Sequence, residues 1–152
     1  MERRTLTFAT YADMRGEIAR LERGGYERAG QWNLGQICKH LSYYMRGSLE
    51  GYPFLLPWLV RKLFGRSLLR KVLAGGHMKT GGRTIPASVP PDAVDETACI
   101  AEAQELITRL EQHQGELHPS PIFDRLTRDE ARALHLLHGA HHLSFLIPGQ
   151  TN

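Results

Sequence analysis

The most constraining feature of this sequence is a histidine-rich amphipathic segment near its C-terminal end. Residues 127–148 hold four of the chain's eight histidines within eight residues. Thr127 and Glu130 have the spacing of a capping box, and Pro148 marks the other end, so one helix is predicted here. A helix would place on one face Ala131, Leu134, His135, His138, His142 and Phe145. The histidines therefore belong to an apolar stripe.

Histidines on an apolar face need partners, because burial favours the neutral ring and its nitrogens must still be satisfied. His138 and His142 are four residues apart, so their rings project in parallel about one helical turn apart. This is the spacing at which one helix supplies two nitrogens to a metal ion. Histidines that only form hydrogen bonds in a core or a cleft have the same spacing. Both interpretations stay open from this segment alone.

Three further segments have the pattern and the caps of long helices. They cover residues 10–24, 33–50 and 95–114, with Asp92 as an alternative start for the last one. Strand signals are nearly absent, and there is no internal repeat. A long connection between the second and third helices predicts an all-α four-helix bundle of up-down-down-up topology. We expect residues 1–152 to form a single domain.

The second predicted helix brings one more histidine to an apolar face. Its stripe comprises Ile37, His40, Leu41 and Tyr44. Cys38 lies two residues from His40, on roughly the opposite side of the helix, and is therefore a poor partner for it at one metal ion. Cys38 and Cys99 form neither a CxxC pair nor a secreted disulfide framework, so we expect two reduced thiols.

Residues 54–74 are basic and amphipathic, and Pro57 and Gly65 predict one broken helix or two short helical pieces there. The charges exclude a transmembrane span. Such a segment can lie on an anionic membrane surface, although an excursion between bundle helices, with its arginines in water, is the commoner explanation.

A Gly- and Pro-rich stretch follows at residues 75–91 and predicts a long loop. His77, Lys79 and Arg83 are candidates to fold over a bound anion, with Lys79 and Arg83 as the candidate substrate loop. A solvated crossover is the alternative.

The whole chain excludes several classes of protein. A net charge of +3 is mild, and no zinc-finger, RNA-binding or helix-turn-helix signature is present, so nucleic acid is not an expected partner. No signal peptide and no apolar run of about 20 residues is found, which leads us to expect a cytoplasmic protein. The sequence contains no Ser/His/Asp signature and no HExxH motif, so neither of these patterns indicates catalysis.

The arrangement resembles a known superfamily. Residues 32–36, WNLGQ, leading into a helix with His40, and a last helix with His138 and His142, resemble the DinB-like four-helix metalloproteins over essentially the whole chain. The run LHLLHGAHHLSF and the segment that begins with GYPF and ends with PW resemble an uncharacterised branch of this superfamily, classed as a domain of unknown function. The resemblance implies one divalent metal ion, zinc or nickel, held by His40, His138 and His142.

The sequence also departs from that pattern. Many members of the superfamily continue the last histidine motif with arginine, glycine and glutamine, whereas this sequence has Leu143, Ser144 and Phe145. Any contact made by those three residues in the relatives is therefore not expected here. His135 is a candidate fourth ligand or a partner of the ligands, and His141 is expected at the rim or in a subunit contact.

Two functions follow from the resemblance and the residues together. Relatives imply a metal-dependent transferase or isomerase, or a hydrolase, that uses a low-molecular-weight thiol and a small-molecule substrate. Three nitrogens would leave positions open on the metal for water or a thiol. The alternative is a non-catalytic, stress-associated or homodimerising module with a structural metal or none.

Overall fold

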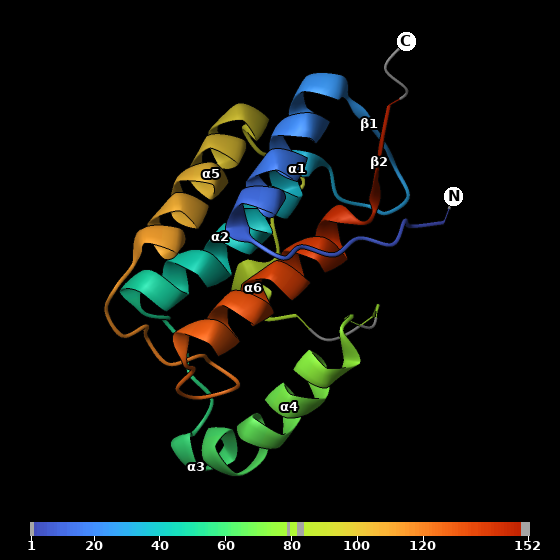
Figure 1. Ribbon diagram of the computed structural model, residues 1–152. Coiled ribbons are helices and arrows are strands. Elements are labelled where there is room, and N and C mark those ends of the chain that lie inside the picture. The colour runs from blue at the N-terminus through green and yellow to red at the C-terminus, as the bar shows by residue number, and fades with distance from the viewer. Residues whose placement is uncertain (1, 79, 82–83, 150–152) are drawn as a thin grey trace.

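Four helices of 14 to 17 residues form the body of the protein in a computed structural model that describes residues 2–78, 80–81 and 84–149 (Figure 1). They are α1 (Tyr11–Gly24), α2 (Leu34–Glu50), α5 (Glu96–Gln112) and α6 (Arg128–Leu143). Helix α2 packs along α5, while α1 contacts both α5 and α6. The prediction of a mainly helical fold is confirmed.

The predicted caps set the starts of these helices. Thr10, Asn33 and Thr127 each accept a hydrogen bond from the backbone N–H three residues on, and the side chain there accepts one from the cap's own N–H. Asp95 accepts a bond from the N–H of Ala98, so α5 starts at the later of the two predicted aspartates.

A single apolar core lies between the four long helices. Its largest fully buried side chains are Met14, Ile18, Leu21, Leu34, Ile37, Leu41, Met45, Leu106, Ile107, Leu143 and Leu146. Helices α2 and α5 approach closely at Gly35, where a Cβ would lie 2.8 Å from the Cα of Glu96. The hydroxyl of Tyr26 joins the same two helices, because it accepts from the N–H of Leu34 and donates to Glu96.

A small sheet departs from the all-α prediction. Strand β1 (Tyr26–Arg28) pairs antiparallel with β2 (Leu146–Pro148), and Glu27 lies opposite Ile147. Helix α6 consequently ends at Leu143, five residues before the predicted end at Pro148. Each strand has only three residues, which is too short to produce an alternating sequence pattern. Backbone bonds on both sides extend the pairing, from Ala29 to Phe145 and from Gly149 to Gly25.

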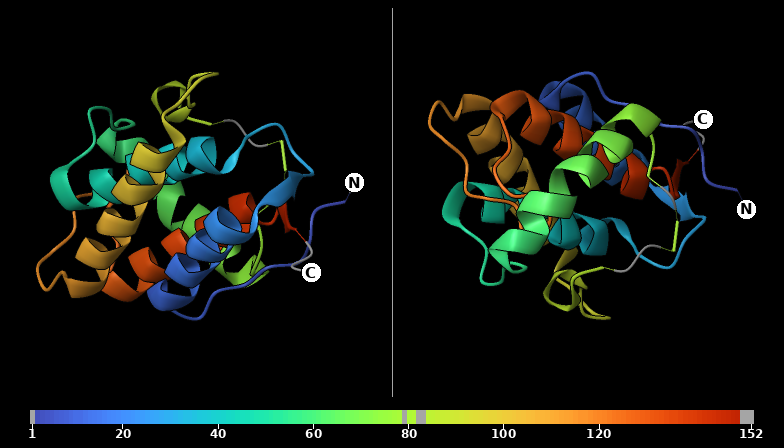
Figure 2. Two further views of the ribbon diagram at one scale, coloured as in Figure 1. Left: turned by 90° about the horizontal axis from the view of Figure 1, so that it is seen from above. Right: turned by 90° about the horizontal axis from the view of Figure 1, so that it is seen from below.

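The connection between α2 and α5 is a separate arm beside the body (Figures 1 and 2). It contains α3 (Trp58–Val60), a π-helical turn (Arg61–Gly65), α4 (Arg66–Gly75) and a 3-10 turn (Pro86–Ser88). Pro57 directly precedes α3. At Gly65 the chain stays helical but changes from π-helical to α-helical geometry, so the segment is one interrupted helix rather than two separate pieces. Among the described residues, no helix is long and apolar enough to cross a membrane.

Candidate metal centre

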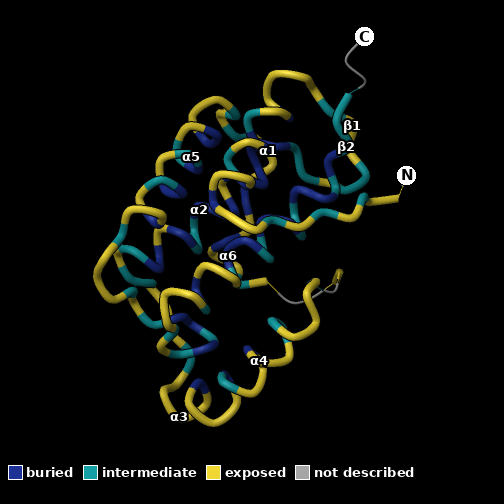
Figure 3. The backbone as a smooth tube through the Cα atoms, viewed as in Figure 1, coloured by how far each residue is buried: buried dark blue, intermediate teal, exposed yellow. Residues whose placement is uncertain are grey.

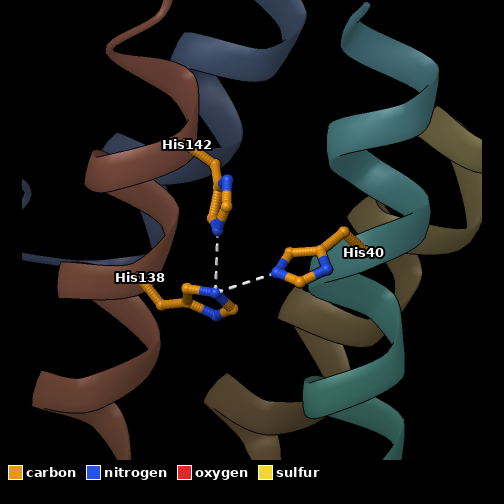
Figure 4. Close-up of side chains that lie close together, drawn as sticks. All are labelled: His40, His138 and His142. Carbon is orange, nitrogen blue, oxygen red and sulfur yellow. Dashed lines mark hydrogen bonds between the residues drawn. The ribbon is translucent and has the colours of Figure 1, made fainter. Parts of the chain in front are cut away.

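Three imidazole rings from two helices converge on one point (Figure 4). The Nε2 atom of His138 lies 3.1 Å from Nε2 of His40 on α2 and 3.0 Å from Nε2 of His142 on its own helix, α6. One ligand atom from each of the three rings lies within 4.8 Å of the other two. Residues 98 positions apart are thus brought into contact by the packing of α2 against α6.

Aromatic side chains fix the orientation of these rings. Trp32 stacks on His142 with an interplanar angle of 20° and also packs on His40. Tyr44, one turn after His40 on α2, places its ring edge against both His40 and His138. Aromatic packing on both sides limits rotation of the imidazoles and holds their nitrogens together.

The tautomer of His40 follows from its second ring nitrogen. Its Nδ1 atom lies 2.8 Å from the backbone carbonyl oxygen of Ser88 in the 3-10 turn. A carbonyl oxygen only accepts, so Nδ1 carries the proton and Nε2 presents a lone pair to the cluster. The hydroxyl of Ser88 donates to the carbonyl of Ile85 and lies 3.2 Å from the Tyr44 hydroxyl, which donates to it.

Burial keeps all three rings neutral. It is the main cause that lowers the pKa of His40, His138 and His142, and the last of these falls to about 2. The neighbouring imidazoles lower the pKa values of His138 and His142 further, because two positive rings in contact repel each other. Three neutral rings could offer lone pairs to a metal ion, which a cluster of charged rings could not.

Two of the three nitrogen pairs are close to the spacing of a metal site, and the third pair, His40 and His142, lies within 4.8 Å. Nitrogens bound to zinc at about 2.0–2.1 Å in a tetrahedron lie roughly 3.3 Å apart. The two closest pairs here, 3.0 and 3.1 Å, need only a small outward shift to reach that value. A hydrogen bond alone does not explain the convergence, because one Nε2 atom of His138 faces two other ring nitrogens and carries at most one proton.

A large cleft opens beside the three histidines. Its volume is about 1240 Å³, and His138 and His142 contribute to its wall. Most of the lining is apolar and includes Trp32, Val72, Phe123, Leu134 and Phe145. The arm supplies one side of this cleft through α4, and the body supplies the other through α2 and α6.

Comparison with known families shows to which family the chain belongs. The family described as "Protein of unknown function (DUF1569)" matches residues 1–149. The chain belongs to the DUF1569 family. No curated protein and no solved structure matches it. The predicted membership in a domain of unknown function is therefore confirmed, and no comparison links this DUF1569 chain to the DinB-like superfamily.

The two additional histidines of α6 have partners of their own. The Nε2 atom of His135 lies 3.0 Å from the Ser48 hydroxyl, and this residue is not among the three whose nitrogens converge. His141 is half-buried beside the cleft, where Arg3 lies 3.1 Å from its Nδ1 and its ring edge meets His142. Lys79 and Arg83, the predicted substrate loop, lie outside the described residues.

Two neighbours of the site had no functional role in the sequence prediction. Ser88 contacts His40 through its backbone carbonyl oxygen, and every residue type has this atom, so the sequence gives no indication of the contact. Trp32 was visible only as part of the WNLGQ motif, although its position just before the second helix was a usable signal.

Cys38 and Cys99 are buried free thiols whose pKa values are raised by burial.

Proposed function

We propose that this protein binds one divalent metal ion through the Nε2 atoms of His40, His138 and His142. The observation that carries the proposal is the convergence of three neutral ring nitrogens at 3.0 and 3.1 Å, with His40 fixed in the ligating tautomer by the Ser88 carbonyl. All-imidazole donors suit zinc and nickel. Residues Trp32 and Tyr44 would keep the rings in position for the ion.

The ion is proposed to serve a reaction rather than to hold the fold together. Three protein ligands leave at least one coordination position free, which is the mark of catalytic sites, whereas structural sites use four. The cleft beside His138 and His142 would give access to that position, and its volume exceeds the roughly 300–1,000 Å³ of ordinary ligand pockets. A divalent ion supplies a Lewis acid that activates a group entering its open position.

The reaction class proposed is a transfer or isomerisation that uses a low-molecular-weight thiol, as the DinB-like resemblance implies. A DinB-like bundle with up-down-down-up helices is part of the same proposal. Support comes from four long helices, a long connection between α2 and α5, and one histidine of α2 facing two of α6. The mostly apolar lining of the cleft favours a substrate that carries a sizeable apolar portion.

Metal content tests the proposal directly. Protein purified without a histidine tag should carry about one zinc or nickel ion per chain by elemental analysis. His138→Ala should reduce this to a trace. His135→Asn is the matched control, because His135 lies on the same helix and is bonded to Ser48. An ion content that is unchanged in His138→Ala, or that is lost equally in the control, contradicts the assignment.

A second experiment separates a reactive site from a structural one. Cobalt(II) would be loaded in place of the native ion, and its visible absorption would be recorded while small thiols are added. A spectral change that requires His142 indicates that a thiol reaches the open position. An unchanged spectrum across a panel of thiols would instead favour a structural metal.

A further inference from the structure

The arm carries nearly all the exposed apolar surface of the described chain. Of its nine exposed large hydrophobic residues, eight fall between positions 54 and 68, and the ninth is Val89. The eight are Phe54, Leu55, Trp58, Leu59, Val60, Leu63, Phe64 and Leu68. Phe64 is 68% exposed and Trp58 57%. Single exposed apolar residues are ordinary on a protein surface, but such a concentration marks an interaction site. We call residues 54–68 the apolar tip (Figure 3).

Polar anchors hold the other side of the apolar tip against the body. Arg61 is buried, pairs with Asp124 at 2.6 Å, and donates to the carbonyl of Leu56. Gly65 packs so closely on the loop before α6 that a Cβ would lie 2.5 Å from the carbonyl oxygen of Ile122. Arg61 is thus held against the body, while Lys62, Arg70 and Lys71 are exposed, and the apolar side chains are exposed as well. The apolar side chains point outward because the inner side is occupied by these contacts.

The charge of this region has one sign. Residues 51–91 contain no aspartate or glutamate. Arg61 and Arg66 are paired with carboxylates of the body, but Lys62, Arg70 and Lys71 are exposed and have no carboxylate partner among the residues described. Lys62 lies 4.7 Å from the centre of the Trp58 ring. The apolar tip is thus bordered by cations available to an anionic partner.

This charge distribution decides between two partners. A two-fold contact between copies places the same patch opposite itself. Lys62, Arg70 and Lys71 of one copy would then face a patch that carries the same positive charges, with no carboxylate in residues 51–91 to compensate. An anionic lipid surface offers the complement, since Trp, Phe and Leu enter the headgroup boundary while Lys and Arg contact phosphates.

We propose that the apolar tip docks this protein on the surface of an anionic lipid bilayer. Trp58, Leu63 and Phe64 enter the interface, and Lys62, Arg70 and Lys71 bind lipid phosphates. The attachment is peripheral. Because Leu68 and Lys71 also line the cleft, docking brings the cleft next to the lipid surface.

Vesicle sedimentation tests the proposal with the full-length protein. The wild-type protein should sediment with vesicles of phosphatidylcholine mixed with phosphatidylserine, and at least tenfold less with phosphatidylcholine alone, because each cation contributes about 1 kcal/mol on an anionic surface. Leu63→Ser with Phe64→Ser should weaken binding at least tenfold, and the exposed Val89→Ser is its control. Lys62→Glu should weaken binding to anionic vesicles, whereas Arg23→Glu, an exposed cation of α1, should not. Circular dichroism would verify that each variant is folded.

Three results would overturn it. The first is wild-type protein that stays in solution with both kinds of vesicle. The second is equal binding by wild-type protein and the Leu63→Ser, Phe64→Ser variant. The third is a concentration-dependent dimer, abolished by that variant, in a protein that binds no vesicles, because the apolar tip would then be an interface between copies. None of these measurements depends on the metal site.

Discussion

Two histidines three residues apart on α6 show how the immediate partner decides what a buried imidazole does. His135 is buried and His138 is half-buried at the cleft, and burial lowers the pKa of each. His135 has a hydroxyl partner in Ser48, whose oxygen is also 3.2 Å from the Tyr52 hydroxyl, so its nitrogen is satisfied within the protein. His138 meets two other imidazoles instead. Only the second arrangement leaves lone pairs for an ion.

The first prediction concerns His135 and pH. Its pKa is lowered from 6.5 to about 4 by burial, so the unfolded chain takes up a proton below pH 6.5 while the folded protein does not. Stability contributed by the neutral ring is present above pH 6.5 and is lost as pH falls to 4. The loss is about 3 kcal/mol at 1.36 kcal/mol per pKa unit.

Urea unfolding of metal-free protein between pH 7 and pH 4 measures this loss. The wild-type protein should lose about 3 kcal/mol more than His135→Gln, whose amide reaches as far as the Nε2 atom that contacts Ser48 but does not titrate. Most of the contribution of the other histidines is common to both proteins, although His135 itself lowers the pKa of His138. Equal losses in the two proteins would show that His135 does not carry the effect.

Spacing along the helices placed His40, His138 and His142 in apolar stripes. The resemblance to the DinB-like metalloproteins then implied that the three act as one ligand set. What spacing does not contain is the identity of contacts made by backbone atoms. The carbonyl of Ser88 reaches His40 across 48 positions, and any residue type at position 88 would carry it. The bond of His135 to Ser48 depends on the register between α2 and α6, which no local pattern encodes.

At the scale of elements, local chemistry predicted the helix starts well. The capping boxes at Thr10, Asn33 and Thr127 join residues three positions apart, so a short stretch of sequence is enough to predict them. The β1–β2 pairing joins residues about 120 positions apart through backbone bonds, and its short strands leave no pattern. The exposure of the apolar tip was not predictable from its sequence, because amphipathicity does not say which side of a segment faces the body.

Glycines in two helices provide the second prediction. A Cβ at Gly35 would lie 2.8 Å from the Glu96 backbone, so Gly35→Ala should force α2 and α5 apart and lower the free energy of unfolding by about 1–3 kcal/mol. Gly16, exposed within α1, has nothing within 4 Å of such a Cβ, so Gly16→Ala should raise it by about 0.5–1 kcal/mol. Chemical denaturation of both variants measures the two changes. A stabilised Gly35→Ala would mean that α2 and α5 pack less closely than described.

At the scale of the whole molecule, distant parts of the chain converge on the end of α6. Arg4 pairs with the buried Glu17 of α1 and donates to the carbonyl of Leu146, which ties the N-terminal segment across this end. The histidine cluster joins α6 to α2, and the Ser88 carbonyl joins α2 to the arm. An ion held by the proposed ligands would therefore link α2 to α6 directly and, through the hydrogen bond of His40 to Ser88, would also strengthen the connection to the arm.

The last prediction follows from that connection. An ion that binds only the folded protein stabilises it by about 2.7 kcal/mol at a free concentration one hundred times its dissociation constant. For a chain of this size, that corresponds to a rise in Tm of roughly 5–10 °C. Adding zinc to chelator-treated wild-type protein should produce this rise in a thermal melt, and a chelator should reverse it.

The matched variants assign the effect to the cluster. His142→Ala should melt at the same temperature with and without zinc, because two nitrogens remain and Trp32 loses the ring that it stacks on. His135→Asn should keep the full rise in Tm, since the His135 ring that it removes is bonded to Ser48 and is not one of the proposed ligands. A rise that persists in His142→Ala would mean that zinc stabilises the protein elsewhere, through exposed histidines such as His118, and that the three buried rings do not hold the ion.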